Sequence, residues 1–382
     1  SPPLGYEPNP YALLDASDFV FIDPVTTGFS RGVGENAPAN EKDFHSVKSD
    51  IESVASFIRR YVSEHGCWHR PIYLMGESYG TFRAAGVARE LFDSAGIEVA
   101  GIVLVSAVID FGTIRRGNGF MSDITFFPAL AATAHYHNRL TPDLQNTEVE
   151  TVYRNAENFA LDEYASALLR AGRLSDAERH DIATKIARYT GLDTEEVLRS
   201  DLRLAPWRFR KSLLRDEGQV IGRFDSRFAM DDGDDAGTNA SFDPSYATVK
   251  SAYSVAFNVY LRQSLGYNPD LNYEVLTNVW PWGFGDLERG QDADLSPQLQ
   301  SMLRQRPGFR VFIASGFYDL ATPPMAVEQS IAQMYLPEEA LERITTRIYE
   351  AGHMMYLDRK EHETLTHDLR SWYQPDEPEK SE

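Results

Sequence analysis

The sequence predicts an α/β fold with a mostly parallel sheet and a helical insertion. Three observations indicate this fold. Short apolar runs of strand length alternate with helix-like periodicity over residues 1–118 and again over residues 301–382. One apolar run passes directly, through a Gly-x-Ser-x-Gly motif, into a helix-like segment. Between residues 119 and 300 helical periodicity dominates and good strands are few, so this part is expected to be an inserted cap.

The composition argues against some classes of binding partner. The chain has 382 residues, 42% of them hydrophobic, which is enough for a large core. Its 37 Lys and Arg stand against 57 Asp and Glu, a formal charge of −20, which argues against nucleic acid or an anionic membrane as partner. Cys67 is the only cysteine, so no internal disulfide is possible. The longest apolar run, Ile102–Ile109, is interrupted by Ser106 and is too short to cross a bilayer.

The first part of the chain is expected to alternate strands and helices. Asp18–Asp23 is a predicted strand. A helix is predicted to start near Asn40 and Asp43 and to end at Gly66, because apolar residues recur there at steps of three and four. After the Gly-x-Ser-x-Gly segment, Ala100–Val108 is the next predicted strand.

The sequence Pro71-Ile-Tyr-Leu-Met-Gly-Glu-Ser78-Tyr-Gly80 fits a nucleophile elbow, a sharp turn that presents a serine between a strand and a helix. Ser78 is therefore the candidate nucleophile, and the flanking glycines are expected to relieve crowding in a strained turn. Gly28-Phe-Ser30-Arg-Gly32 fits the same pattern, but it neither follows a strand directly nor opens a helix. A glycine-rich loop is the better interpretation of that second motif.

The insertion carries clear helical signals. The segment Asn158–Ala171 places apolar side chains on one face, and Ser175 with Glu178 forms a capping box at the start of the next helix. Two histidines here, His135 and His137, lack a placed third ligand, so ordinary capping or surface roles are favoured over a metal site. No metal and no cofactor are expected.

The α/β pattern returns near the end of the chain. Phe309–Gly316 and Arg343–Tyr349 are predicted strands, and a polar helix is expected from Glu361 onward. Between these strands, Thr322 is predicted to cap a helix that has Pro323 in its first turn.

A serine nucleophile needs a histidine to accept its proton, and the histidine needs an acid to orient it. Of the nine histidines, His353 fits best, because it follows a predicted strand and comes after Gly352, which permits a tight turn. Asp319 lies on the loop after a strand, about 34 residues before His353, in the chain order Ser, Asp, His of the α/β-hydrolases. Asp110, after the preceding strand, is the competing acid, and a helix-capping role stays open for both.

With these sites in place, the chain resembles the serine carboxypeptidase family of α/β-hydrolase fold, particularly its bacterial branch. Four segments carry the resemblance. Gly76-Glu-Ser-Tyr-Gly80 is similar to the family's nucleophile motif, and Phe21–Ser30 to its strand-and-loop signature. Ala351-Gly-His-Met354 is similar to its histidine motif, and Gly316-Phe-Tyr-Asp319 to its aspartate loop. The resemblance extends through essentially the whole chain.

The resemblance implies a role for each residue. Ser78 attacks the peptide carbonyl, His353 acts as base and then acid, and Asp319 orients it. The Tyr79 backbone N–H supplies an oxyanion donor, and Glu77 shares a proton with the free C-terminal carboxylate of the substrate. Two like charges at close range do not both stay ionised, so activity is expected to favour acidic pH. The implied substrates are peptides with a free C-terminus, and the implied location is periplasmic or secreted.

The family's Gly-Gly-Pro-Gly loop, with its second oxyanion donor, lies upstream of the point where this chain begins. In the hydrolase strand order, the strand before that loop sits between Asp18–Asp23 and Ile72–Met75. We therefore expect residues 1–382 to be incomplete alone, either as a fragment or with a second polypeptide supplying the missing strands.

Two other functions stay open. The same triad serves an esterase or an acyltransferase on this scaffold, although Glu77 favours the peptidase. A chain with half an oxyanion hole is also compatible with an inactive or purely binding subunit, since losing one donor costs roughly 10²–10³ in rate. Glu77 itself has a plainer interpretation as a buried, paired structural acid.

Overall fold

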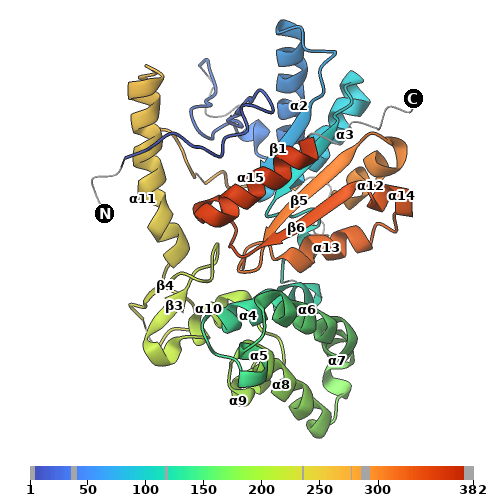
Figure 1. The fold of residues 1–382 in the computed structure, drawn as a ribbon, viewed down its shortest axis with the longest axis vertical. Helices are drawn as coiled ribbons and strands as arrows, with labels where there is room; N and C mark the ends of the chain where they lie inside the picture. Colours follow the sequence, from blue (N-terminus) through green and yellow to red (C-terminus); the bar gives the residue numbers. More distant parts are fainter. Residues whose placement is uncertain are drawn as a thin grey trace, which may run out of the picture.

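Four parallel strands form the main sheet of the molecule (Figure 1). The computed structural model describes residues 5–35, 41–116, 119–234, 236–276, 278–284 and 293–373. The strand order is β1-β2-β5-β6, and each neighbouring pair is parallel. This confirms the predicted α/β fold. The strands are β1 (Tyr73–Glu77), β2 (Gly101–Val105), β5 (Arg310–Gly316) and β6 (Ile344–Tyr349).

Helices cover both faces of this sheet, which is why its central strands are continuous apolar runs. Along β2, Ile102 and Leu104 face one hydrophobic cluster, whereas Val103 and Val105 face another, as the two-residue period of a strand requires. The first cluster is packed by α2 (Val47–Glu64), α3 (Tyr79–Ala95) and α12 (Ser296–Gln305); the second is packed by α15 (Arg359–Tyr373).

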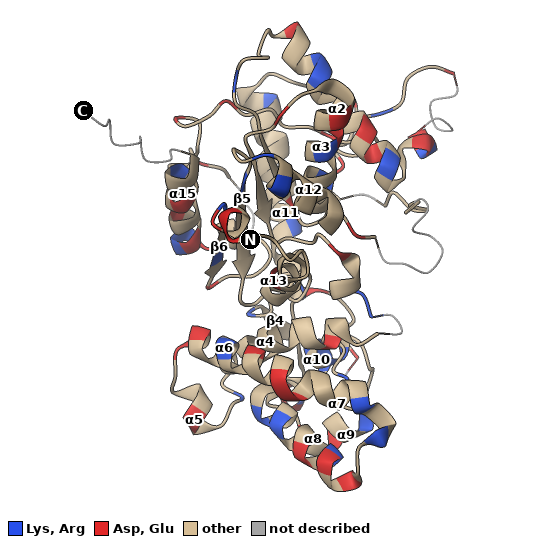
Figure 2. Ribbon diagram, turned by 90° about the vertical axis from the view of Figure 1, so that its right-hand side faces the viewer, with Lys and Arg blue, Asp and Glu red and all other residues tan. Residues whose placement is uncertain are grey.

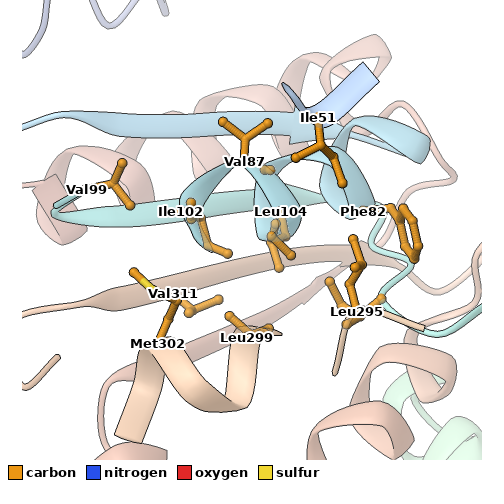
Figure 3. Close-up of a cluster of buried hydrophobic side chains, with 14 of the residues drawn as sticks. Ile51, Phe82, Val87, Val99, Ile102, Leu104, Leu295, Leu299, Met302 and Val311 are labelled. Carbon is orange, nitrogen blue, oxygen red and sulfur yellow. The ribbon is translucent and has the colours of Figure 1, made fainter. Parts of the chain in front are cut away.

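Figure 3 shows the first cluster, where Val87 of α3, Leu104 of β2 and Leu299 of α12 point into one apolar volume. Gly86 of α3 permits the close approach of α2 to α3, because a Cβ there would lie 2.3 Å from the side chain of Ile51 in α2. Two further helices lie along the chain between β5 and β6, namely α13 (Pro324–Ala332) and α14 (Glu338–Leu341).

A helical part lies below the sheet in Figure 1 and has its own hydrophobic cluster. Its centre is α4 (Met121–Tyr136), in which 13 of 16 residues are buried, so that this helix is covered on all sides. Leu320, in the loop after β5, and Met325, in α13, belong to the same cluster and join the two parts. Around α4 lie α5 (Pro142–Gln145), α6 (Val149–Phe159), the π-helical Ala160–Tyr164, α7 (Ala165–Arg170), α8 (Asp176–Thr190), α9 (Thr194–Arg199) and α10 (Pro206–Ser212).

A small hairpin and a long helix complete the inserted region. The antiparallel strands β3 (Gln219–Ile221) and β4 (Ala229–Asp231) precede α11 (Pro244–Val259), which continues as the π-helical Tyr260–Ser264. In Figure 1 α11 stands to one side of the sheet. Single 3₁₀ turns occur at Glu41–Phe44, Phe111–Thr113, Ala171–Arg173, Arg215–Glu217 and Met355–Leu357.

The prediction of a strand at Asp18–Asp23 was wrong. The segment forms no ladder with any described strand, and the Phe21 side chain is 88% exposed. A strand is defined by its pairing, so an apolar run without a neighbour stays an irregular extended segment. Within the described residues, β1 likewise pairs only with β2, and its Met75 is 45% exposed.

Two predicted helix starts were also wrong. The helix before the elbow begins at Val47, where the Ser46 side chain accepts a hydrogen bond from the Ser49 N–H. Asp43 lies in the preceding 3₁₀ turn, and Asn40 lies outside the described residues. The helix predicted to be capped by Thr322 begins at Pro324 instead.

Other local predictions are confirmed. The capping box at Ser175 and Glu178 is present at the start of α8. The helix predicted over Asn158–Ala171 is part of a longer helical run in which Tyr164 is fully buried. Figure 2 shows basic and acidic residues interspersed over the surfaces of the helices. Among the described residues, no helix combines the length and the apolar character needed to span a bilayer.

Candidate active site

Ser78 occupies the strained turn between β1 and α3. Its φ of 56° and ψ of −124° are unusual for a residue with a side chain, and its N–H donates to the Val105 carbonyl of the next strand at 3.0 Å. Gly76 permits the turn, because a Cβ at that position would lie 2.0 Å from the Gly80 carbonyl oxygen. At Gly80 an added Cβ would meet no described atom within 4 Å, so only the first glycine is sterically required here.

The second Gly-x-Ser-x-Gly motif is a loop, as predicted. The Phe29 N–H donates to the Asp23 carboxylate at 3.0 Å, and the Ser30 N–H donates to the Thr27 carbonyl at 2.8 Å. Ser30 therefore lies in a hydrogen-bonded turn and not at the end of a strand.

His353 and Asp319 form a buried pair. The His353 Nδ1 lies 2.7 Å from Asp319 Oδ2, and the two residues are 2% and 0% exposed. The other carboxylate oxygen, Oδ1, accepts from the backbone N–H groups of Ala321 at 2.7 Å and Thr322 at 3.0 Å. These donors stabilise the ionised carboxylate, which can in turn hold the imidazole in one orientation.

Thr322 and Ser106 make further polar contacts with this pair and with the histidine loop. The Thr322 hydroxyl lies 2.9 Å from Asp319 Oδ2, 3.2 Å from His353 Nδ1 and 2.9 Å from the Ser106 carbonyl oxygen. Ser106 has a φ of 52°, and its own hydroxyl donates to the His353 carbonyl at 2.6 Å. The loop after β2 is thereby fastened to the histidine loop after β6.

Close backbone packing holds the acid and histidine loops together. A Cβ on Gly316 would lie 2.3 Å from the carbonyl oxygens of Ala351 and Gly352. Gly352 in turn faces the inserted region, where a Cβ would lie 2.4 Å from the Phe224 carbonyl oxygen, and the His353 N–H donates to that oxygen at 2.6 Å. Gly352 was expected to permit a tight turn. In the structure it permits the close approach of the inserted region at Phe224.

Burial and charge oppose each other at His353. Burial disfavours the imidazolium and lowers the pKa, but the charge and hydrogen bond of Asp319 outweigh this effect, with a smaller contribution from Glu77. The net result is a His353 pKa above its ordinary value.

Glu77, immediately before Ser78, accepts a hydrogen bond from Tyr356. The Tyr356 hydroxyl lies 3.1 Å from Oε1 and 2.9 Å from Oε2 of this carboxylate. Burial raises the pKa of Glu77 above its usual range; the charge of His353 and the Tyr356 hydrogen bond oppose that rise, and the charge of Asp319 adds to it. A carboxyl beside the nucleophile is thus biased toward its protonated form.

The hydroxyl of Ser78 is the candidate nucleophile. Within the described part of the chain, the Ser78 hydroxyl makes no hydrogen bond, including none to His353. Catalytic hydrogen bonds in free enzymes are often long and tighten only with substrate bound. Tyr79, as the first residue of α3, has a backbone N–H without an intrahelical acceptor.

The competing candidates have other contacts. Asp110 accepts from the Gly112 N–H at 2.7 Å and caps a 3₁₀ turn. His135 Nε2 lies 2.9 Å from the Thr147 carbonyl oxygen, and His137 Nε2 lies 2.7 Å from that of Ser226. No cluster of three or more His, Cys, Asp or Glu that could hold a metal ion occurs among the described residues.

A family model described as serine carboxypeptidase matches residues 4–366. The chain belongs to the serine carboxypeptidase family. The expected family resemblance and α/β-hydrolase fold are thereby confirmed. No curated protein matches the chain.

Two solved structures show a distant likeness to this serine carboxypeptidase family member. The crystal structure of VinJ is 13% identical with a TM-score of 0.33, covering 90% of this chain and 79% of VinJ. A highly thermostable carboxyl esterase from Bacillus coagulans, in complex with glycerol, is 12% identical with a TM-score of 0.36, covering 92% and 78% of the two chains. TM-scores this low leave the alignments too loose to transfer the role of any residue.

Sequence reasoning missed three residues of the site in this family member. Ser106 left a signal, as the single polar residue within an apolar run. Thr322 matched a helix-capping pattern, and that pattern gave no indication of its contact with Asp319. Tyr356 left no signal, because its contact with Glu77 joins residues that are 279 positions apart.

Proposed function

We propose that this chain is a serine carboxypeptidase that releases C-terminal residues from peptides through an acyl-enzyme on Ser78. The observation that carries the proposal is Glu77, a carboxyl with a raised pKa directly beside the candidate nucleophile. A protonated carboxyl there can donate a hydrogen bond to a substrate carboxylate, which an ordinary esterase site has no need to recognise.

The reaction divides into two acyl transfers. Ser78 Oγ attacks the carbonyl of the last peptide bond while its proton passes to His353 Nε2, and Asp319 stabilises the imidazolium. The Tyr79 N–H binds the developing oxyanion. Breakdown of the tetrahedral intermediate transfers the proton from His353 to the leaving amine and frees the C-terminal amino acid. Water, deprotonated by His353, then attacks the acyl-enzyme and releases the shortened peptide.

The buried His353–Asp319 contact of 2.7 Å supports these roles, since it holds the imidazole with Nε2 free for the nucleophile. All three candidate residues follow strands of one parallel sheet, at whose carboxyl edge ligand sites usually form. The division into core residues 1–118 and 301–382 and an inserted cap over 119–300 is part of the same proposal. The hydrophobic cluster around α4 supports it, since all of its buried residues except Leu320 and Met325 come from the insertion.

One alternative has an observation in its favour. The pair of His353 and Asp319 serves any acyl transfer, so an esterase or acyltransferase remains the second candidate.

The deciding experiment measures release of the C-terminal residue from an N-blocked dipeptide from acidic to neutral pH, because the mechanism needs a protonated Glu77 together with a neutral His353. The same dipeptide with a C-terminal amide is the comparator. We expect turnover of the free acid and not of the amide, and a fall in kcat of at least about 10⁴-fold in Ser78→Ala. Equal turnover of acid and amide would instead indicate an esterase-like site that ignores the carboxylate. Turnover that survives in Ser78→Ala would exclude this nucleophile.

A further inference from the structure

The loop between β3 and β4, residues 222–228, belongs to the inserted region but contacts the acid loop of the main sheet. These contacts lie on both sides of Asp319 in the chain. The Arg223 carbonyl accepts from the N–H of the residue after Asp319 at 3.0 Å, and the Ser226 N–H donates to the carbonyl of the residue before it at 3.0 Å. The backbone that carries the acid is therefore paired with the inserted region before and after the acid.

The same β3–β4 loop also contacts the histidine loop. The His353 N–H donates to the Phe224 carbonyl at 2.6 Å, and the Arg227 guanidinium donates to the Glu350 carbonyl at 2.7 Å. Gly352 permits this approach, because a Cβ there would lie 2.4 Å from the Phe224 carbonyl oxygen. The acid and histidine loops follow different strands, and loops are more mobile than the strands they follow. The β3–β4 loop bridges the two.

The Phe224 side chain contacts the imidazole itself. The ring centroids of Phe224 and His353 are 5.2 Å apart, and the two planes are inclined by 41°. Aromatic rings at such a separation attract each other. Asp319 and Thr322 both contact one imidazole atom, Nδ1, at 2.7 and 3.2 Å. Contacts at one atom fix a point and do not fix the tilt of the ring, whereas the Phe224 ring lies against its face or edge and limits that tilt.

The β3–β4 loop is held in turn by two helices of the inserted region. At the start of α11, the Ser245 hydroxyl accepts from the Phe224 N–H at 3.2 Å. From α4, Thr133 Oγ1 lies 2.6 Å from Ser226 Oγ, and the Nε2 of His137 lies 2.7 Å from the Ser226 carbonyl oxygen. A residue can orient a functional side chain only if it is itself fixed, and these contacts fix the loop.

We propose that Phe224 is a positioning residue, which sets the orientation of His353 through its carbonyl and its ring, so that the inserted region completes the pair of His353 and Asp319. The inference rests on the proposed function, in which His353 Nε2 takes the proton of Ser78. Asp319 fixes the Nδ1 end of the imidazole, and Phe224 fixes the tilt that directs Nε2. The direction matters, because a misplacement of about 1 Å can lower a rate by about 10²-fold.

A proton NMR measurement tests the positioning without any substrate. A proton on His353 Nδ1, in a 2.7 Å contact with the buried Asp319 carboxylate, resonates far downfield and exchanges slowly with water while the imidazole stays in place. His353→Gln assigns this resonance by removing it. We expect the resonance in the unmodified protein and its loss, through faster exchange with water, in Phe224→Leu. That variant keeps an apolar side chain and the backbone carbonyl but lacks the ring.

Two further variants separate positioning from a general loosening of the loop. Phe228→Leu makes the same change in the same loop, at a half-buried ring that does not contact His353 within the described residues, and is expected to keep the resonance. Phe224→Tyr keeps the ring and is expected to keep the resonance as well. A resonance that survives in Phe224→Leu, that disappears equally in Phe228→Leu, or that is absent from the unmodified protein would overturn the proposal.

Turnover separates this inference from the proposed function. For the N-blocked dipeptide, Phe224→Leu is expected to lower kcat by about tenfold with KM within about twofold, and Phe224→Tyr is expected to restore most of kcat. Unchanged kcat in Phe224→Leu would overturn the positioning role and leave the carboxypeptidase standing. A resonance that responds as expected, in a protein that turns over no dipeptide, would support the positioning role and refute the peptidase.

Discussion

The Tyr356 hydroxyl donates to the Glu77 carboxylate, from which it lies 2.9 Å (Oε2) and 3.1 Å (Oε1). This contact joins the loop after β6 to the residue that precedes the candidate nucleophile at the end of β1. Burial raises the pKa of Tyr356, so its phenol stays a donor over the working pH range. After burial and the charge of His353, the protonation of Glu77 is therefore also influenced by a neighbour that the family motifs do not include.

Tyr356→Phe is predicted to extend activity to higher pH. The Tyr356 hydrogen bond stabilises the ionised form of Glu77, so its loss raises the pKa of Glu77 further. The protonated carboxyl then persists to higher pH, and the alkaline limb of kcat/KM for a free-acid dipeptide moves upward. Tyr253→Phe is the control. Burial and the charge of Glu77 raise the pKa of Tyr253, but Tyr253 has no hydrogen bond to Glu77 within the described residues. A downward shift in Tyr356→Phe would contradict the proposed state of Glu77.

Glu77→Gln is predicted to remove the alkaline limb of the pH profile and to leave the acidic limb in place. An amide donates at every pH, so the alkaline rise in KM that accompanies ionisation of Glu77 disappears. On the acidic limb Glu77 is already protonated and carries no charge that could act on His353, so that limb is expected to stay in place. Steady-state kinetics from acidic to neutral pH measure both limbs. A profile that matches the unmodified enzyme would reduce Glu77 to a structural acid.

Thr322→Val is predicted to lower kcat by about tenfold with little change in KM, because the lost hydroxyl held a charged partner of His353. Thr322 acts through Asp319 and is a positioning residue. Thr322→Ser keeps the hydroxyl and is expected to restore most of kcat. Equal losses in the two variants, or a change confined to thermal stability, would show that the hydroxyl has no part in orienting the pair.

The two glycines of the elbow are predicted to respond differently to alanine. Gly76→Ala forces a methyl group to within 2.0 Å of the Gly80 carbonyl oxygen, and we expect it to destabilise the protein by at least about 2 kcal/mol and to abolish activity. Gly80→Ala meets no described atom within 4 Å and lies in a helix, where alanine is favoured over glycine by up to about 1 kcal/mol. Denaturant unfolding compares them, and similar losses in both would contradict the steric argument.

How far sequence reasoning reached depends on whether a feature is local. Ser78 could be identified because a nucleophile elbow is specified within about ten residues, by an apolar run, a sharp turn and a helix. His353 and Asp319 followed from chain order and the position of each after a strand, since a parallel sheet brings such loops to one edge. The 2.7 Å contact between them obeys that rule.

The sequence by itself thus determined the α/β architecture, the family and the candidate triad, all of which rest on short-range patterns. Only the tertiary structure decided that Asp18–Asp23 is not a strand, because strand formation depends on a neighbour. It also brought Thr322 to Asp319 and Tyr356 to Glu77, and it placed Tyr79 and Trp282 in the wall of one cavity beside Ser78. Hydrogen-bond partners and cavity walls arise from residues far apart in the chain, so no local pattern encodes them.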